Sequence, residues 1–399
     1  MKKFDKITLS LGGHSSRYYG KSGFNIKIRG KKDLYGRNHF KLRSGSRDAT
    51  YLRHKIVYDI QNHLGIPSLS ANFSQLYING EYIGLYIMMD CFKTSWIEYV
   101  YSEKDTTSLY KCTGFGNIPN IQSYMDKRTC TNENEDYTDR TEYNEFIRNL
   151  ETARTIEDYE KFFDVDLFIT QIALEYLLGS WDHFINGGNN IFLYKPRNGN
   201  DQRWKFLLYD FDADFGQDII DEDKFNMIYQ DLFNYTMEND QELFKPEISN
   251  NLFKPHKNDS IKHPYYSFED YALHGYLLDA LIFNHQELFE NKLKELITKI
   301  FNPTILFPHI DSLKEFIEPY VRLDKTLNNE GIYPGKFDRK NNIYTYEQWR
   351  DNCEFTPVKN VVETNSGSYG IKYWILAKYR YICTVLHLDC DPNYMNISQ

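Results

Sequence analysis

The sequence feature that constrains the fold most is a pair of strand-like segments joined by Asn79-Gly80. Phe73 to Ile78 and Tyr82 to Met89 are rich in apolar and aromatic residues and flank this dipeptide directly. An Asn-Gly pair between such segments is the strongest short-range signal for a β-hairpin. Two earlier segments alternate apolar and polar residues on either side of a small-residue turn, namely residues 7–11 and 24–29. We therefore expect the front of the chain to be mostly β-sheet.

Helical periodicity takes over further along the chain. Leu52, Ile56, Ile60 and Leu64 recur every four residues and predict a helix from Asp48 to His63. The other expected elements are a hairpin of residues 191–194 and 204–209 and helices over residues 155–181, 270–301, 311–322 and 369–386. We therefore predict an α+β fold with a β-rich N-lobe and a mostly helical C-lobe. The expected bounds are residues 1–115 and 116–399, with residues 116–141 as a variable insertion or connection.

Composition excludes several classes of protein. The 399 residues carry 47 Lys and Arg against 56 Asp and Glu, and this net charge of −9 argues against binding to a nucleic-acid backbone. Hydrophobic residues make up 41% of the chain, enough for a large core, so wholesale disorder is excluded. No apolar run approaches the roughly 20 residues that span a bilayer. Six cysteines without a Cys-x-x-Cys pair argue against a structural zinc, and their even number permits disulfides without requiring them.

The N-terminus gives little information about location. Met1-Lys2-Lys3 resembles the start of a signal peptide, but Phe4-Asp5-Lys6 follows where an apolar stretch belongs. Two alternatives remain open: a cytoplasmic protein, or a targeting segment outside this chain.

Three carboxylates at alternate positions directly follow an apolar strand. Asp210, Asp212 and Asp214 would share one face of an extended chain, where their mutual repulsion is costly unless a cation lies among them. The alternative is a solvated acidic turn at the end of an edge strand. Spacing alone favours neither interpretation over the other.

A second polar segment follows the expected helix that ends near Trp181. It contains Asp182 and, seven and eight residues later, Asn189 and Asn190. Alone it is typical of a loop at a helix C-terminus. Together with the downstream carboxylates, it follows the order in which phosphotransferases of the kinase type present a base, a metal-binding Asn and a metal-binding Asp. The usual catalytic-loop signature separates Asp and Asn by about five residues, so this is not an ordinary protein kinase.

The front of the chain offers a candidate phosphate site. The turn from Gly12 to Ser16 could present backbone N–H groups to phosphates, and Lys27 projects from the strand that follows. A solvated polar sheet face is the more common explanation for any single lysine.

Taken in order, these motifs resemble the CotH family of spore coat protein H-like atypical kinases. The front motifs are Gly13-x-Ser15-Ser16, Lys21, Phe24 to Lys27, Leu34-Tyr35-Gly36, Lys41 to Ser44, Asp48, Leu52-Arg53, Leu64 to Pro67 and Tyr77 to Tyr86. The rear motifs are Trp181-Asp182, Asn189-Asn190-x-Phe192-Leu193-Tyr194 and Asp210-x-Asp212-x-x-Phe215-Gly216. The likeness covers most of the chain from Gly13 to Leu388.

The resemblance implies a secreted or surface-associated kinase with an atypical, two-lobed protein-kinase-like fold. Such an enzyme uses ATP with Mg²⁺, or Mn²⁺ in its place, to phosphorylate Ser or Thr of a protein substrate. Carried over by motif, Asp182 would be the catalytic residue, and Lys27 would hold phosphates, with Lys21 the second choice. The expected metal ligands are Asp210, Asp212 and one of Asn189 and Asn190; the other expected nucleotide contacts are Gly13, Ser15, Ser16 and Arg53.

The chain departs from the family pattern at three places. Gly12-Gly13-His14-Ser15 stands where the family often has Arg-Gly-Asn-Ser, His54 follows Arg53 where a carboxylate is common, and Asp90 replaces a frequent Glu. These departures indicate a weakened or inactive kinase as an alternative to the active one. Two other classes of protein remain as alternatives. One is a surface adhesion or scaffold module that has lost turnover. The other is a hydrolase that binds metal through Asp210, Asp212 and Asp214.

Overall fold

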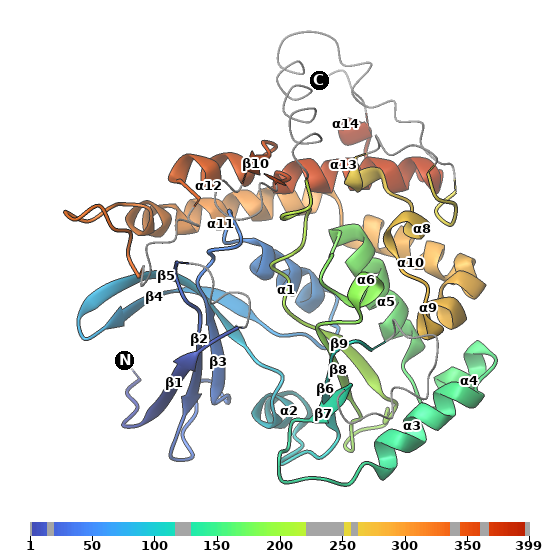
Figure 1. Cartoon of the computed structure of the whole chain (residues 1–399). Coiled ribbons are helices and arrows are strands. Elements are labelled where there is room, and N and C mark those ends of the chain that lie inside the picture. The colour runs from blue at the N-terminus through green and yellow to red at the C-terminus, as the bar shows by residue number, and fades with distance from the viewer. Residues whose placement is uncertain are drawn as a thin grey trace.

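Two antiparallel sheets organise the part of the protein that contains the candidate residues (Figure 1). The computed structural model describes residues 2–13, 20–115, 129–220, 251–256, 262–335, 344–359 and 367–395. The first sheet has the strand order β1-β2-β3-β5-β4. Its strands are β1 (Ile7–Leu11), β2 (Phe24–Ile28), β3 (His39–Arg43), β4 (Ala71–Ile78) and β5 (Glu81–Asp90), and helix α1 (Arg53–His63) connects β3 to β4. The front of the chain is therefore the predicted sheet.

The hairpin predicted at Asn79-Gly80 is confirmed by the pairing of β4 with β5. Asn79 and Gly80 have φ angles of 53° and 85°. Both angles are positive, as the two central residues of a type I′ turn require. The helix predicted from Asp48 begins only at Arg53. The Asp48 carboxylate accepts hydrogen bonds from the backbone N–H groups of Thr50 and Arg53, which keeps residues 48–52 in a turn before the helix.

The second sheet has the order β7-β6-β8-β9 and contains the other predicted hairpin. Its strands are β6 (Leu109–Cys112), β7 (Cys130–Asn132), β8 (Ile191–Tyr194) and β9 (Lys205–Leu208). A disulfide between Cys112 and Cys130 joins β6 to β7, and a second one joins Cys383 to Cys390. The second sheet thus takes β6 from the range expected for the front lobe.

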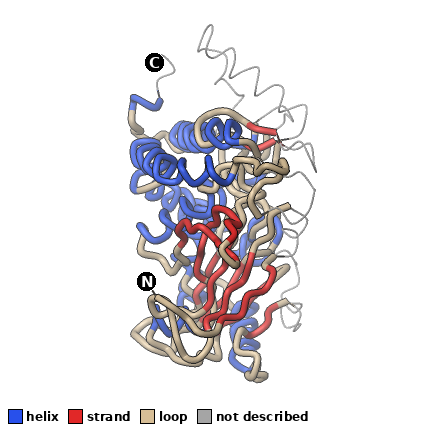
Figure 2. The backbone as a smooth tube through the Cα atoms, turned by 90° about the vertical axis from the view of Figure 1, so that its left-hand side faces the viewer, coloured by secondary structure: helices blue, strands red, loops and turns tan. Residues whose placement is uncertain are grey.

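Helices make up most of the remaining described chain, and the long helices α11 and α13 lie above both sheets in the view of Figure 1. Figure 2 shows most of the strands gathered below a layer of helices. The elements are α2 (Thr94–Tyr101), α3 (Thr141–Thr152), α4 (Ile156–Glu160), α5 (Val165–Leu178), α6 (Phe184–Gly187), η3 (His263–Tyr265), α8 (Phe268–Tyr271), α9 (Tyr276–Leu281), η4 (Phe283–His285), α10 (Gln286–Lys299), α11 (Pro303–Asp324), α12 (Tyr346–Asn352), β10 (Val358–Lys359), β11 (Gly367–Ser368), α13 (Ile371–Val385) and α14 (Pro392–Met395).

Two of the predicted long helices are broken. The helix predicted over residues 155–181 is α4 followed by α5, because Asp164 caps α5 by accepting the backbone N–H of Leu167. The helix predicted over residues 270–301 is divided among α8, α9, η4 and α10, with extended backbone at Ala272 and Gly275. The prediction near residues 369–386 is confirmed as α13, and the one at residues 311–322 extends back to Pro303, where Asn302 caps α11.

One large core joins these elements. All residues of α5 except Asp166 are buried, so this helix packs on every side. The core continues from α1 and β5 through α5 and β8 to α13. Among the described residues, no helix combines the length and apolar character needed to cross a bilayer.

Candidate functional site

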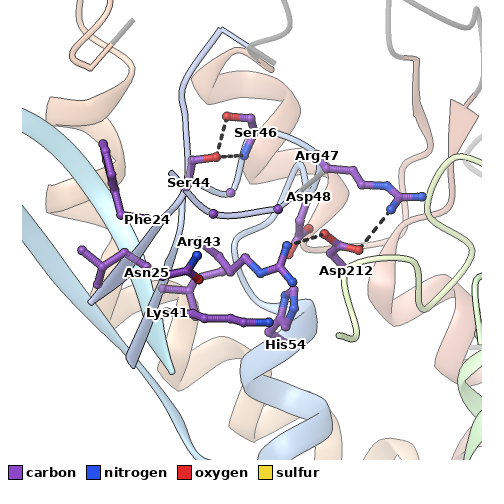
Figure 3. A pocket seen from close by; sticks show the side chains of 16 residues that line it. Phe24, Asn25, Lys41, Arg43, Ser44, Ser46, Arg47, Asp48, His54 and Asp212 are labelled. Atoms are coloured by element: carbon purple, nitrogen blue, oxygen red, sulfur yellow. Dashed lines mark hydrogen bonds and ion pairs between the residues drawn. The ribbon is translucent and has the colours of Figure 1, made fainter. Parts of the chain in front are cut away.

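A cleft of about 700 Å³ lies between the two sheets. Strands β1, β2 and β3 line one side, and the segments that flank β8 and β9 line the other. The residues with charged or amide side chains in this cleft include Lys27, Lys41, Arg43, Arg47, Asp90, Lys93, Lys111, Glu133, Asp182, Asn190, Asp210 and Asp212. A smaller pocket adjoins it and shares Gly13, Lys41, Arg43, Arg47 and Asp212 with it (Figure 3). The cleft therefore brings together most of the residues predicted for the site.

Asp182 lies in a loop that begins where α5 ends. Gly179 ends this helix in the left-handed conformation at a φ of 66°. The side-chain amide of Asn189 donates to Asp182 Oδ1 over 3.3 Å, and that of Asn190 donates to the Asp182 carbonyl over 2.7 Å. Asn190 lines the cleft, whereas Asn189 is not among the lining residues. The two asparagines therefore differ: Asn189 holds the Asp182 carboxylate, whereas Asn190 holds the Asp182 backbone and lines the cleft.

The three alternate carboxylates do not share a face, contrary to the prediction. Strand β9 ends at Leu208, and Asp210 has a φ of 75°, so this segment turns instead of extending. Asp210 and Asp212 line the cleft, whereas Asp214 is fully buried. Burial raises the pKa of Asp214 to about 6, against the opposing effect of His183. A three-carboxylate site of the kind a hydrolase would use is therefore not assembled here.

Basic side chains neutralise the two carboxylates in the cleft. Arg43 pairs with Asp210 through Oδ2, and Asp210 Oδ1 lies 3.3 Å from Nε2 of His54. Arg47 pairs with Asp212 at 3.1 Å. Burial acts to raise the pKa of Asp210, but Arg43 and His54 hold it well below its usual range. Asp210 is therefore an anion at any physiological pH.

The residues around Asp210 fit a divalent cation. One ligating atom each from His54, Asp210 and Asp212 can be chosen so that all three lie within 4.8 Å of one another. Asn190 lines the same cleft, and an amide oxygen is a donor of the kind that suits Mg²⁺ and Mn²⁺. Each carboxylate has two oxygens, so one can keep its arginine while the other binds an ion.

The predicted phosphate-binding residues separate into two groups. Gly13 and Lys27 line the cleft, but Lys21 and Arg53 do not. Lys21 is buried, and its ammonium donates to Asp324 at 2.6 Å and to the carbonyl of Leu85 at 2.9 Å.

Arg53 is also fully buried, and its guanidinium holds the loops around the rear of the site. It pairs with Asp48 and donates to the carbonyls of Asp214 and Tyr369. Ser15 and Ser16 lie outside the described residues.

Four residues of the cleft and its adjoining pocket escaped the sequence prediction. Lys41 and Arg43 alternate on β3 and face the cleft together, Arg47 follows on the next loop, and His54 comes from α1. The ammonium of Lys41 lies 5.2 Å from the ring centroid of Tyr209, and burial together with Arg43 lowers its pKa. The period-two spacing of Lys41 and Arg43 was a usable signal, because alternate residues of a strand share a face.

His183 links the Asp182 loop to the Asp210 loop and was also missed as a functional candidate. Its Nε2 donates to the carbonyl of Asp210 over 2.9 Å, and its Nδ1 lies 3.3 Å from Glu175. Burial lowers the pKa of His183, but Glu175 outweighs it and raises the value to about 9. The ring stacks on Phe211. His183 therefore fixes the positions of Asp182 and Asp210 relative to each other.

Comparison with known proteins assigns the chain to a family. Residues 9–356 match the family described as CotH kinase protein, so the chain belongs to it. Among curated relatives, spore coat protein homolog 1 of Rhizopus delemar is 25% identical over 88% of this chain and 52% of its own length. Invasin CotH2 of the same organism is 24% identical, over 94% of this chain and 58% of its own. Inner spore coat protein H of Bacillus subtilis is 24% identical over 55% of this chain and 61% of its own. The chain spans about half the length of the first relatives it matches.

Proposed function

We propose that this protein is a metal-dependent kinase that transfers the γ-phosphate of ATP to Ser or Thr of a protein substrate. The observation that carries the proposal is the shared cleft. Asp182, Asn190 and the Asp210–Asp212 pair come from two separate loops and face the lysines of a glycine-flanked sheet. Phosphoryl transfer needs these parts: a carboxylate at the acceptor hydroxyl, oxygen ligands for the metal, and cations for the phosphates.

The roles follow from the positions of these residues. Asp182 would accept the proton of the acceptor hydroxyl as its oxygen bonds to the γ-phosphorus. The bond between that phosphorus and the β–γ bridging oxygen breaks, and ADP leaves. Asp210, Asp212 and Asn190 would hold the divalent ion, which neutralises the charge of the β- and γ-phosphates when bound. His183 would keep the two loops in register without touching the reacting atoms.

The proposal includes a two-lobed arrangement like that of protein kinases. In those enzymes the phosphate-binding lysine lies on a strand that precedes a helix of the front lobe. Lys41 has this position here, on β3 ahead of α1. Lys27, on the neighbouring strand β2, faces the same cleft. We therefore assign the phosphates to Lys41 together with Lys27.

A surface or spore-coat location is part of the proposal. Relatives are named as spore coat proteins and as invasins. The two disulfides are of a kind that persists in oxidising surroundings outside the cytoplasm. Both observations favour a secreted or surface-exposed protein over a cytoplasmic one.

A second candidate is a surface adhesion or scaffold module without turnover. Arg43 and Arg47 already neutralise Asp210 and Asp212, so the described conformation needs no metal to stabilise these carboxylates. Invasin names among the relatives favour this alternative as well.

Incubation with γ-labelled ATP separates the two candidates. The kinase should transfer label to itself or to an added Ser-rich or acidic protein, only with Mg²⁺ or Mn²⁺ present. Loss of transfer on chelation, and in the Asp210→Ala variant, would support the enzyme. Absence of label on every acceptor with either metal, from a folded protein, would favour the scaffold.

A further inference from the structure

We infer that His54 is a metal ligand and that the site it completes takes Mn²⁺ in preference to Mg²⁺. This inference rests on the proposed function for the presence of a divalent ion at Asp210 and Asp212. The inference goes beyond that function in two ways: it adds a nitrogen donor to the ligand set, and it says which ion the site prefers.

His54 is built into the site from α1. Its side chain is 1% exposed, and its Nε2 is directed at Asp210 Oδ1 at 3.3 Å. The Nδ1 atom is also buried and forms no hydrogen bond within the part of the chain that the structure describes. No such bond fixes the tautomer, so Nε2 can donate its lone pair to an ion with the ring proton on Nδ1. Binding of the ion then has to offset the cost of a buried N–H that has no acceptor among the described residues.

Each carboxylate has one oxygen that is not held by a close arginine. In Asp210 this oxygen faces His54, and in Asp212 its nearest cation is 4.0 Å away. Arg43 pairs with Oδ2 of Asp210, so Oδ1 is the atom turned to His54. Arg47 holds Oδ1 of Asp212, and Oδ2 of that carboxylate is 4.0 Å from Arg43. Figure 3 shows His54, Arg43 and Asp212 converging at one end of the pocket. An ion bound here would replace only the longest of these arginine contacts.

The separations are close to those that one ion requires. Ligands held about 2.1 Å from an ion lie about 3 Å apart at right angles and about 4.2 Å apart across the ion. The ligating atoms of His54, Asp210 and Asp212 lie within 4.8 Å of one another. Small rotations of these side chains therefore suffice to bring all three onto one ion.

A mixed set of donors selects among metals. Mg²⁺ is bound in proteins mainly by oxygen and dehydrates reluctantly, whereas imidazole suits first-row transition ions. Mn²⁺ shares the preference of Mg²⁺ for carboxylate oxygens but is a first-row transition ion, the weakest binder of that series, and it therefore accepts an imidazole more readily than Mg²⁺ does. Adding the nitrogen of His54 to the oxygen ligands should therefore shift the preference of the site from Mg²⁺ to Mn²⁺.

Binding of Mn²⁺ alone to the full chain tests the inference without reference to turnover. Electron paramagnetic resonance follows the loss of the free Mn²⁺ signal on titration, and Mg²⁺ is then added as a competitor. Pulsed measurements detect nitrogen hyperfine coupling when an imidazole is bound directly. The variants are His54→Gln, which removes the donor, and His54→Glu, which supplies an oxygen. His39→Gln is the matched control, since His39 lines the same cleft but is not part of the ligand group.

The wild-type protein should show nitrogen coupling and bind Mn²⁺ at least about tenfold more tightly than Mg²⁺. His54→Gln should lose the coupling and weaken Mn²⁺ binding by about 10–100-fold, the range known for loss of even an outer-shell partner of a metal ligand. His54→Glu should narrow the ratio of the two affinities, and His39→Gln should change neither quantity. Circular dichroism checks that each variant is folded.

Two outcomes would overturn the inference: bound Mn²⁺ without nitrogen coupling, or an unchanged affinity ratio in folded His54→Glu. Either can occur in a protein that transfers phosphate with Mg²⁺, in which case the proposed function survives and this inference fails. If nitrogen coupling from His54 is found in a protein that transfers no phosphate, this inference survives and the proposed function fails.

Discussion

Asp182 is the residue on which the choice between enzyme and scaffold depends. The Asp182→Asn variant keeps the shape of the side chain but cannot accept a proton from the acceptor hydroxyl. We expect transfer of phosphate to fall by about 10²–10⁴-fold, the usual contribution of a general base, with ATP affinity retained. Measuring turnover and nucleotide binding on the same preparation checks this. Unchanged transfer would mean that another group is the base.

Lys27 and Lys41, the two lysines assigned to the phosphates, should differ from the buried Lys21. Lys41→Ala and Lys27→Ala should each weaken ATP binding by roughly 10–100-fold, since hydrogen bonds to charged groups contribute about 1.5–3 kcal/mol. Lys41 should have the larger effect, because it has the position of the phosphate-binding lysine of protein kinases, on β3 ahead of α1. Titration with a fluorescent ATP analogue measures the affinities of the Lys41→Ala, Lys27→Ala and Lys21→Ala variants against that of the wild-type protein. An equal loss in Lys21→Ala, with the fold intact, would return that residue to the phosphate site.

The Lys21–Asp324 pair is a matter of stability. Asp324 also accepts from Tyr51 at 2.5 Å and from the backbone of Leu85 at 2.8 Å, and so ties α11 to the first sheet. Asp324→Asn would leave the Lys21 ammonium buried without a counter-ion and should cost about 3–5 kcal/mol in the free energy of unfolding. Denaturant unfolding measures this loss. Asp5→Asn, which breaks the exposed pair with Lys32, is the control and should leave the unfolding midpoint unchanged.

Among the elements, the end of α5 decides where the loop that carries Asp182 starts. Gly179 has a positive φ, and a Cβ placed there would lie 2.0 Å from the ring of Trp374. Gly65, just past the end of α1, has nearly the same φ, but nothing lies within 4 Å of such a Cβ. Position 179 therefore requires glycine for two reasons: its backbone is left-handed, and the ring of Trp374 leaves no room for a Cβ.

Paired substitutions separate the two effects. Gly65→Ala should cost only the strain of the left-handed backbone, about 1–2 kcal/mol. Gly179→Ala should cost about 1–3 kcal/mol more, because the ring of Trp374 has to move. The ring is held by its bond to the Leu177 carbonyl at 2.9 Å. Urea unfolding of both variants gives the difference, and equal losses would show that Trp374 yields freely.

For the whole molecule, the cleft between the sheets predicts that nucleotide and metal bind together. The triphosphate needs its charge neutralised before it can lie beside Asp182 and Asp210. ATP with Mg²⁺ or Mn²⁺ should raise the melting temperature, since a ligand at a hundredfold excess over Kd stabilises a protein by about 2.7 kcal/mol. ATP with a chelator should give no shift, and the shift should shrink in Asp210→Ala. An equal shift without metal would contradict the proposed site.

Local sequence signals predicted much of the architecture correctly. The Asn79-Gly80 hairpin, the hairpin of β8 with β9, and α13 follow from turn chemistry and apolar periodicity, which act over a few residues. Long apolar patterns predicted helices that were too long where a polar side chain forms a hydrogen bond with the backbone and so starts a new helix. Asp164 divided one predicted helix because its carboxylate caps the next one, a choice that periodicity does not register.

The sequence by itself determined the order of the candidate residues, their chemical types and the family to which the chain belongs. Only the tertiary structure decided which of them meet. Lys21 and Arg53 have the charge that phosphates require, yet long-range contacts with Asp324 and Tyr369 bury them as structural ties. His54 and Arg43 are far from Asp210 in sequence, yet both contact its carboxylate. The physical reason is that charge and spacing are local properties, whereas burial and pairing arise when distant segments pack against one another.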